Sequence, residues 1–385
     1  MKYTLTIKTL FGLEPILAEE LNNLGYKDHE QHIRAISLKG DLKDIYFLNL
    51  HLRTAISILV EFEKFTIKND SELYHKLKRI PWTEIFDLDK TFSIRGAVNS
   101  KMFKHSQFPI LVCKDAIVDS FKKKYDDRPN VETKSPDLVF DLHIRDHDVT
   151  VSLNSSGVPL YQRGYRTKTG VAPINEVLAA GMIQMSGWKA DSDLYDIFCG
   201  SGTILIEAAL LANDIPSNII RKGYAFQKWK NYNEKMWEEI YEKANKRPKR
   251  DLNITIRGCD IDAEVIQSAR NNIKKLPLGK TIDFQIKSFE DFEPESDHGV
   301  IISNPPYGKR INPDSIMEMY QGIGDKLKKS FNGYDCWFIS SNLEVMKFIG
   351  LRPSRKIKLF NGSDECSFRK FEVYEGSKKA KNNPN

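Results

Sequence analysis

The sequence lacks the features that mark several classes of protein. Its five cysteines are scattered and form no C-x-x-C pair, which argues against a disulfide framework and a zinc site and favours reduced thiols. The amino terminus lacks the apolar core of a signal peptide, and no apolar run approaches membrane length. We therefore expect a cytoplasmic protein with no membrane partner and no metal.

Two nucleotide-binding motifs are also missing. No G-x-x-x-x-G-K-[ST] is present, so a nucleoside triphosphate is disfavoured. The glycine pair Gly200 and Gly202 is not continued to a third glycine, which disfavours a dinucleotide. What the chain has is 385 residues with 41% hydrophobic content, enough for two or three domains with ordinary cores.

The formal net charge of +6 is unevenly arranged. Between Arg95 and Lys124 seven residues are basic and two are acidic, and the stretch 149–175 contains no acidic residue. Such clusters suit a phosphate backbone, although a solvated face is the commoner explanation for any one of them. The candidate RNA-binding residues in these stretches are Arg95, Lys101, Lys104, Arg163 and Arg166.

Residues 1–155 mix helical and alternating patterns and predict two small α+β units, 1–60 and 66–155. The expected strands are 3–9, 35–39, 57–65, 91–97, 138–145 and 148–153, the last two forming a hairpin, and the expected helices are 14–24, 42–50, 71–80 and 110–124.

Residues from 172 onward alternate strands with helices, which predicts an α/β domain with a parallel, doubly wound sheet. The expected strands are 194–198, 254–259, 282–287, the apolar run that ends before Asn304, and 336–340, followed by an edge hairpin of 352–359 and 366–373. The expected helices open at Glu176, Thr203, Ala263 and Ile316.

The run Ile301 to Ser303 reads as a buried strand that Asn304, Pro305, Pro306 and Tyr307 end. The Asn304 side-chain oxygen and the Pro305 carbonyl can each accept a hydrogen of an exocyclic amino group, so that its lone pair points at an electrophile. Tyr307 can stack on a base. The motif therefore predicts methylation of an amino nitrogen on a planar group; a plain Pro-Pro turn is the structural alternative.

A donor site is expected at the ends of the neighbouring strands. Gly200 and Gly202 allow close approach of a ligand, Asp196 can hold an ammonium group, and the helix start at Thr203 favours a carboxylate. Asp260 can take both ribose hydroxyls, whereas Asp262 is expected to cap a helix. After the third strand the expected contacts to the adenine are Ser288 and Phe289.

The long connection 213–251 contains three tyrosines and two tryptophans among many lysines. Aromatic side chains among cations suit unstacked RNA. However, Trp237, Ile240 and Tyr241 have helical spacing, which favours packing of a helix onto the domain.

With these motifs in order, the sequence resembles the THUMP-domain RNA guanine-N2 methyltransferases, and within them the amino-terminal half of the large-ribosomal-RNA enzyme. The matching segments are 163–166 (RGYR), 172–176 (APINE), 196–203 (DIFCGSGT), 259–262 (CDID) and 304–308 (NPPYG). The resemblance implies a ferredoxin-like α+β unit (1–60), a THUMP domain (61–155) and a Rossmann-like seven-stranded methyltransferase domain (172–376), with a linker at 156–171. From its composition, the tail 377–385 is expected to be disordered.

The resemblance implies methylation of a guanine N2 in 23S ribosomal RNA, free or in a ribosome-assembly intermediate, with S-adenosyl-L-methionine as cofactor. It adds Pro173, Asn175, Phe198, Ile261 and Asn304 to the cofactor site, and we expect Lys309 and Arg310 to contact RNA. The large-ribosomal-RNA enzyme continues into a second methyltransferase domain that makes 7-methylguanine. We expect this second activity to be absent here. Alternatives are guanine N2 of transfer RNA, adenine N6 of a nucleic acid, a protein glutamine, or a non-catalytic RNA-binding assembly factor.

Overall fold

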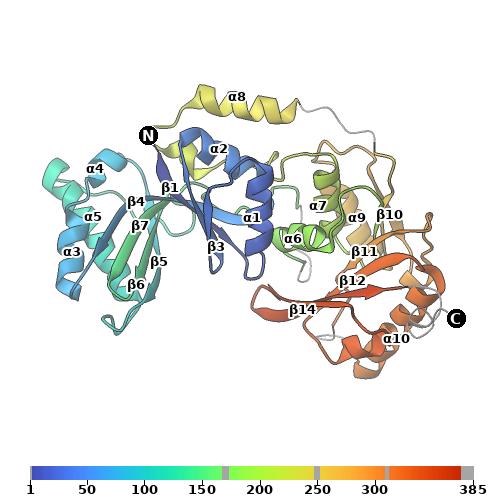
Figure 1. Cartoon of the computed structure of the whole chain (residues 1–385). Coiled ribbons are helices and arrows are strands. Elements are labelled where there is room, and N and C mark those ends of the chain that lie inside the picture. The colour runs from blue at the N-terminus through green and yellow to red at the C-terminus, as the bar shows by residue number, and fades with distance from the viewer. Residues whose placement is uncertain (1, 167–172, 247–251, 308–311, 374–385) are drawn as a thin grey trace. The chain divides into compact units, whose positions relative to one another are not determined.

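The computed structural model describes residues 2–166, 173–246, 252–307 and 312–373 (Figure 1). The chain forms two compact units. Unit 1 comprises Met1–Thr9, Glu20–Leu160 and Arg221–Lys243; unit 2 comprises Leu10–Glu19, Tyr161–Ile220 and Ala244–Asn385. Each unit is built around one seven-stranded sheet. The tail expected at 377–385 lies outside the described residues.

The sheet of unit 1 has the strand order β2-β3-β1-β4-β7-β6-β5. All neighbouring strands are antiparallel except β5 and β6, which are parallel. The strands are β1 (Tyr3–Thr9), β2 (His29–His32), β3 (Ala35–Gly40), β4 (Ala55–Thr66), β5 (Phe92–Asn99), β6 (Leu138–Arg145) and β7 (Asp148–Asn154). The expected hairpin of β6 and β7 is confirmed.

Strand β4 joins the two halves of this sheet. It is 12 residues long and pairs with β1 on one side and with β7 on the other, with a register shift between Glu61 and Glu63. The two predicted α+β units therefore share one sheet, because one continuous ladder of hydrogen bonds crosses from the first to the second. Strand β2 was not predicted, since its sequence HEQH carries no apolar alternation.

The helices of unit 1 lie close to their expected positions. They are α1 (Glu14–Asn23, grouped with unit 2 up to Glu19), α2 (Leu42–His51), α3 (Asp70–Lys78), α4 (Trp82–Ile85) and α5 (Gln107–Tyr125). Helix α2 begins with a capping box between Asp41 and Asp44. A cluster of aromatic rings packs α4 and α5 onto the sheet, with the Phe86 ring 4.7 Å from Phe121 and 5.7 Å from Phe140.

Part of the long connection belongs to unit 1. It contains the short 3-10 helix η1 (Ala225–Lys228) and helix α8 (Glu234–Asn245). The ring of Tyr46 on α2 lies 4.4 Å from Phe226 and 6.2 Å from Trp237, and Tyr224 and Trp229 are buried. These aromatic side chains therefore pack η1 and α8 within unit 1, as the helical spacing predicted.

The sheet of unit 2 has the order β10-β9-β8-β11-β12-β14-β13. The first five strands are parallel and β14 is antiparallel to both neighbours, which confirms the Rossmann-like α/β fold and the edge hairpin. The strands are β8 (Asp193–Asp196), β9 (Ile256–Asp260), β10 (Ile282–Ile286), β11 (Gly299–Ser303), β12 (Tyr334–Ser340), β13 (Arg355–Asn361) and β14 (Asp364–Glu372).

The helices of unit 2 follow the strands as expected. They are α6 (Glu176–Ser186), α7 (Thr203–Ala212), α9 (Ala263–Ile273) and α10 (Pro313–Ser330), with the 3-10 turns η2 (Phe289–Asp291) and η3 (Val345–Ile349). Helix α7 is apolar nearly all round and almost entirely buried, as expected for a helix beside a central strand. Helix α10 buries Ile316, Tyr320, Ile323 and Leu327 at helical spacing.

No helix within the described ranges is long and apolar enough to cross a bilayer. The same residues contain no group of three or more His, Cys, Asp or Glu placed to hold a metal ion. The parallel strands β8, β9, β10 and β11 all end at one edge of the unit 2 sheet, which is where open α/β sheets bind ligands.

Candidate active site

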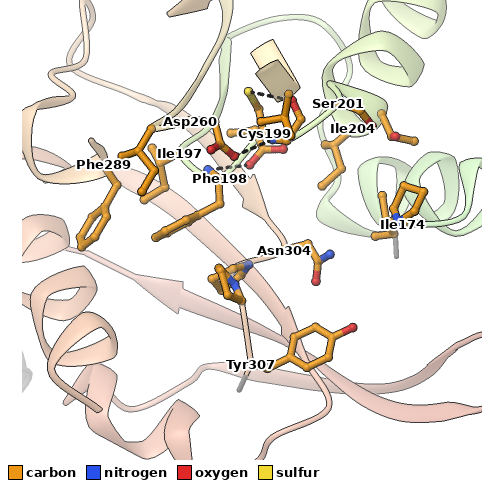
Figure 2. A pocket seen from close by; sticks show the side chains of 18 of the residues that line it. Ile174, Ile197, Phe198, Cys199, Ser201, Ile204, Asp260, Phe289, Asn304 and Tyr307 are labelled. Atoms are coloured by element: carbon orange, nitrogen blue, oxygen red, sulfur yellow. Dashed lines mark hydrogen bonds between the residues drawn. The ribbon is translucent and has the colours of Figure 1, made fainter. Parts of the chain in front are cut away.

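A cavity of about 750 Å³ opens in unit 2 at this edge of the sheet. Figure 2 shows Asn304 and Tyr307 on one side of it and Asp260 and Cys199 across from them. The residues that line it are Pro173, Ile174, Asp196, Ile197, Phe198, Cys199, Gly200, Ser201, Thr203, Ile204, Asp260, Ile261, Val265, Lys287, Ser288, Phe289, Glu290, Asn304, Pro305, Pro306, Tyr307, Met319 and Asp364. The cavity therefore brings both predicted motifs, the donor loop and the Asn-Pro-Pro-Tyr turn, into one space.

Asp196 ends β8 and is almost completely buried. Its Oδ1 accepts hydrogen bonds from the Ser303 hydroxyl at 2.6 Å and from the Phe198 N–H at 3.1 Å. Burial raises the pKa of Asp196 to about 7, the two hydrogen bonds lower it, and the nearby Asp260 adds to the rise. The cavity thus contains a carboxyl group whose charge changes near neutral pH.

The glycines of the loop have different roles. Gly200 lines the cavity, whereas Gly202 does not. Gly202 has a φ of 80°, and a Cβ there would lie 2.8 Å from the Phe284 ring and 3.1 Å from Ala269. The lack of a side chain therefore allows the turn to pack against α9 and β10, while contact between Gly202 and the cofactor stays a prediction.

Asp260 ends β9 and tethers the glycine loop. Its Oδ2 accepts the Gly200 N–H and its Oδ1 accepts the Asp262 N–H, both at 3.0 Å. Burial is the main cause that raises the pKa of Asp260. Asp262 caps α9 by accepting from Glu264 and Val265, as expected. Ile261 between them lines the cavity and is 75% exposed, so its side chain is available to a flat ligand.

The turn after β10 forms another wall. Ser288 caps η2 by accepting the Glu290 N–H, and its hydroxyl donates to Glu290 Oε2 at 3.1 Å. The Phe289 ring lies 5.0 Å from the Phe198 ring, and Figure 2 shows the two side by side. Ser288 and Phe289 lie where they were predicted, while Glu290 and Lys287 supply charged groups that the motif reading missed.

Asn304 to Tyr307 follow β11, whose five residues are all buried. Pro305 is buried, and Asn304 and Tyr307 are partly exposed toward the cavity. Among the residues that the structure describes, none hydrogen-bonds the Asn304 side-chain amide, which leaves its oxygen available to a substrate. Lys309 and Arg310, predicted to contact RNA, lie outside the described residues.

Two predicted RNA-binding arginines have internal partners. Arg163 is 1% exposed, and its guanidinium pairs with the equally buried Glu207 at 3.4 Å. That prediction is wrong, because the guanidinium has no access to a phosphate. Arg166 lies mostly inside unit 2 and pairs with Glu176 at 2.9 Å, so its prediction as an RNA contact is also not supported. Asn175 does not line the cavity and caps α6 instead.

The remaining RNA candidates lie in unit 1. Arg95 is exposed on β5, and Lys101 and Lys104 are exposed in the loop between β5 and α5. The ring of Phe103 in this loop lies 6.2 Å from the ring of Phe108 at the start of α5, and Phe108 is 45% exposed. This surface combines cations with accessible aromatic rings.

Ten residues that line the cavity were not predicted. Most are neighbours of motif residues and could have been included for that reason; Met319 on α10 and Asp364 on the β13–β14 hairpin carry no motif signal. The ten are Ile174, Ile197, Cys199, Ser201, Ile204, Val265, Lys287, Glu290, Met319 and Asp364.

The family described as an RMKL-like methyltransferase domain matches residues 163–370, more than half of the chain. The chain belongs to this family. A THUMP domain matches residues 68–154, and an RlmL ferredoxin-like domain matches residues 4–59. The resemblance inferred from the sequence motifs is thereby confirmed.

Individual relatives of the chain carry the names of methyltransferases. The chain is 36% identical over 364 residues to a "Putative RNA methyltransferase" of Synechocystis, covering 94% of this chain and 95% of that protein. It is 36% identical over 371 residues to a "Ribosomal RNA large subunit methyltransferase K/L" of Shewanella frigidimarina, covering 95% of this chain and 52% of that protein. The chain thus spans about half the length of this second relative.

A solved structure described as "a putative methyltransferase complexed with SAH" superposes with a TM-score of 0.86 at 25% identity, covering 98% of this chain and 99% of that one. The chain therefore contains a methyltransferase domain, and S-adenosyl-L-methionine is the cofactor expected from its motifs. The cavity suits that cofactor, because its volume lies within the usual range for small-molecule sites and it combines carboxylates with apolar and aromatic walls.

Proposed function

We propose that this chain methylates the exocyclic N2 amino group of a guanine in 23S ribosomal RNA. The observation that carries the proposal is the position of Asn304–Tyr307, which share one cavity with Asp260 and the glycine loop. S-adenosyl-L-methionine, when bound, supplies an electrophilic methyl group. Residues 172–376 would carry out the transfer and residues 1–155 would capture the RNA.

The acceptor side uses the groups that follow β11. The Asn304 side-chain oxygen and the Pro305 carbonyl each accept one hydrogen of the amino group, which turns the nitrogen lone pair toward the donor. Tyr307 stacks on the base, which must first be flipped out of any helix. Positioning supplies most of the acceleration, so no side chain is needed as a general base before the methyl group is transferred.

The donor side uses the ends of β8, β9 and β10. The buried carboxylate of Asp196 binds the ammonium group of the cofactor, and Asp260 binds the ribose hydroxyls. Phe289 and Ile261 flank the adenine, with Ser288 at its edge. Phe198 and Pro173 complete the apolar walls.

RNA as the substrate is supported by the THUMP match, by the exposed Arg95, Lys101 and Lys104 beside Phe108, and by the names of the relatives. Cations neutralise phosphates and exposed rings stack on unpaired bases. The choice of guanine over adenine rests on the resemblance to the guanine-N2 enzymes, since both bases present an amino group to the same motif.

The test measures the rate at which Asn304→Ala methylates ribosomal RNA. The RNA is isolated from cells that lack this protein, so that its target base is unmodified. Loss of one acceptor for the amino group should lower the rate about 100-fold or more, while calorimetry should find cofactor affinity nearly unchanged. Asn271→Ala, on α9 outside the cavity, is the matched control.

Analysis of the modified nucleosides identifies the product. N2-methylguanosine at one position of 23S RNA is the expected result. N6-methyladenosine would replace the proposal by its adenine alternative, methylation of transfer RNA alone would move the substrate, and near-normal turnover by Asn304→Ala would refute the role of the motif.

A further inference from the structure

Arg166 does not itself line the cavity, but its guanidinium contacts residues that do, beside the glycine loop. Its Nε and Nη2 donate to Glu176 Oε1 at 3.0 and 2.9 Å. Nη2 also lies 3.3 Å from the Ile174 carbonyl and 3.2 Å from Thr203 Oγ1, and Nη1 lies 3.4 Å from Ser201 Oγ. Three of these four partners, Ile174, Ser201 and Thr203, line the cavity.

The guanidinium has hydrogen-bonding capacity left on the side that faces the loop. Arginine carries five N–H donors in a rigid fork. Glu176 occupies the Nε and Nη2 edge, whereas Nη1 has one long contact, to the Ser201 hydroxyl, among the residues that the structure describes. Nη1 can therefore donate a stronger hydrogen bond to an anion placed beside Ser201.

The surroundings of Ser201 and Thr203 favour such an anion. Helix α7 begins at Thr203 after Gly202, which offers no side chain to cap the first N–H groups. The guanidinium contacts both hydroxyls and so lies beside the amino end of α7, whose N–H groups also favour negative charge. Fixed hydrogen bonds from Glu176 hold the guanidinium in place, which reduces the entropy lost when a ligand binds.

The lining of the cavity is mostly acidic, so an anionic group of a ligand needs a cation beside it. Four of its described lining residues are acidic (Asp196, Asp260, Glu290 and Asp364), and the one basic residue among them, Lys287, follows β10. A carboxylate near the glycine loop would be repelled by Asp196 and Asp260. Arg166 is the cation that stands against this loop.

We propose that Arg166, together with the hydroxyls of Ser201 and Thr203, recognises the α-carboxylate of S-adenosylmethionine. The proposal rests on the proposed binding of the cofactor in this cavity, with its ammonium group at Asp196. The arginine of the RGYR segment thus serves the cofactor, and the charge pattern that suggested RNA has a different origin.

The test compares three ligands by calorimetry: S-adenosylhomocysteine, its decarboxylated analogue, which lacks the carboxylate alone, and 5′-methylthioadenosine, which lacks the carboxylate and the ammonium group. Arg166→Met should bind S-adenosylhomocysteine about 10- to 100-fold more weakly, the usual effect of losing a hydrogen bond to a charged group. It should bind the other two within about threefold of the unchanged protein, because they offer nothing for Arg166 to bind.

Two further variants guard against a general effect on folding. Arg166→Met combined with Glu176→Gln leaves no carboxylate without its partner and should show the same ligand pattern. Arg166→Lys should recover part of the affinity for S-adenosylhomocysteine. Arg270→Met, on α9 with its guanidinium on the Phe284 carbonyl, removes an arginine outside the cavity and should leave all three affinities unchanged.

The pattern of the three affinities decides whether Arg166 binds the carboxylate. Equal weakening of all three ligands would mean that Arg166 only shapes the cavity, and unchanged affinities would mean that it lies outside the carboxylate site; either result overturns the proposal and leaves the cofactor cavity intact. If the unchanged protein bound none of the three ligands, the placement of the cofactor itself would fail. A smaller salt slope of RNA binding in Arg166→Met, with normal cofactor affinity, would restore the RNA role.

Discussion

The buried carboxyl group of Asp196 makes both stability and cofactor binding depend on pH. Asp196 is 1% exposed, and its Oδ1 accepts hydrogen bonds from Ser303 and Phe198. Asp196→Asn keeps an oxygen that can accept both bonds and removes the charge. The variant therefore isolates the effect of ionisation from the effect of shape.

The magnitude follows from the pKa. Burial raises the pKa of Asp196 from 3.8 to about 7, so between these values the unfolded chain has lost a proton that the folded chain still holds. The stability that the folded chain gains from holding this proton is fully present below about pH 4 and is lost as the pH rises to about 7. Two pH units at about 1.4 kcal/mol each predict a loss of about 3 kcal/mol between pH 5 and pH 7.

The assay is urea unfolding of the cofactor-free protein at pH 5, 6, 7 and 8. Between pH 5 and 7 the free energy of unfolding of the wild-type protein should fall by about 3 kcal/mol more than that of Asp196→Asn. At pH 8 the variant should be the more stable of the two proteins. Asp325→Asn, which removes a carboxylate that is 79% exposed, should retain the full pH dependence. Identical curves for the unchanged protein and Asp196→Asn would refute the reasoning.

Cofactor binding provides the second measurement for Asp196. An ammonium group prefers the ionised carboxylate, so affinity for S-adenosylmethionine should rise up to tenfold per unit between pH 5.5 and 7. Asp196→Asn should bind more weakly and lose this slope. The charge that costs stability in the free protein is then the charge that binds the ligand, a common relation between stability and function.

Two further predictions concern other charged residues. Arg163→Met should destabilise unit 2 by about 3–5 kcal/mol, because it leaves Glu207 buried without its cation, and adding Glu207→Gln should restore part of the loss; full additivity in urea unfolding would contradict the pairing. Neutralising Lys101 and Lys104 together should weaken RNA binding and lower its salt slope by about two, whereas neutralising exposed Lys27 should not; an unchanged slope would exclude phosphate contact by this loop.

The sequence predicted well the features that depend on residues close together in the chain. The Asn-Pro-Pro turn can only follow the end of a strand, because neither proline can donate to the ladder, and Asn304 lies there. Asp262 was expected as a helix cap from its place before Ala263, and it is one. The alternation of strands and helices fixed which strand ends meet, so Asp196, Asp260 and Asn304 could be placed in one site without coordinates.

The parts that it predicted badly depend on distant partners. Arg163 reads as an exposed cation in a stretch without acidic residues, and its partner Glu207 lies 44 residues away inside an apolar helix. Strand β2 pairs through its backbone and has almost no apolar side chains, so no hydrophobic period marks it. Asp364 reaches the cavity because β14 runs antiparallel beside β12, a placement that requires the tertiary fold.

The side chains of the RGYR segment divide between helices α6 and α7, and the first turn of α7 borders the cavity. Arg163 and the Tyr165 hydroxyl both contact Glu207 on α7, at 3.4 and 3.1 Å, while Arg166 contacts Glu176 at the start of α6. A four-residue segment thus holds the glycine loop against the amino end of α6. Because Arg163 and Tyr165 are fully buried and Arg166 is not, the first two fix the segment and leave the third positioned to meet a ligand. Substitution of Arg163 should therefore lower stability and cofactor affinity together, whereas substitution of Arg166 should separate them.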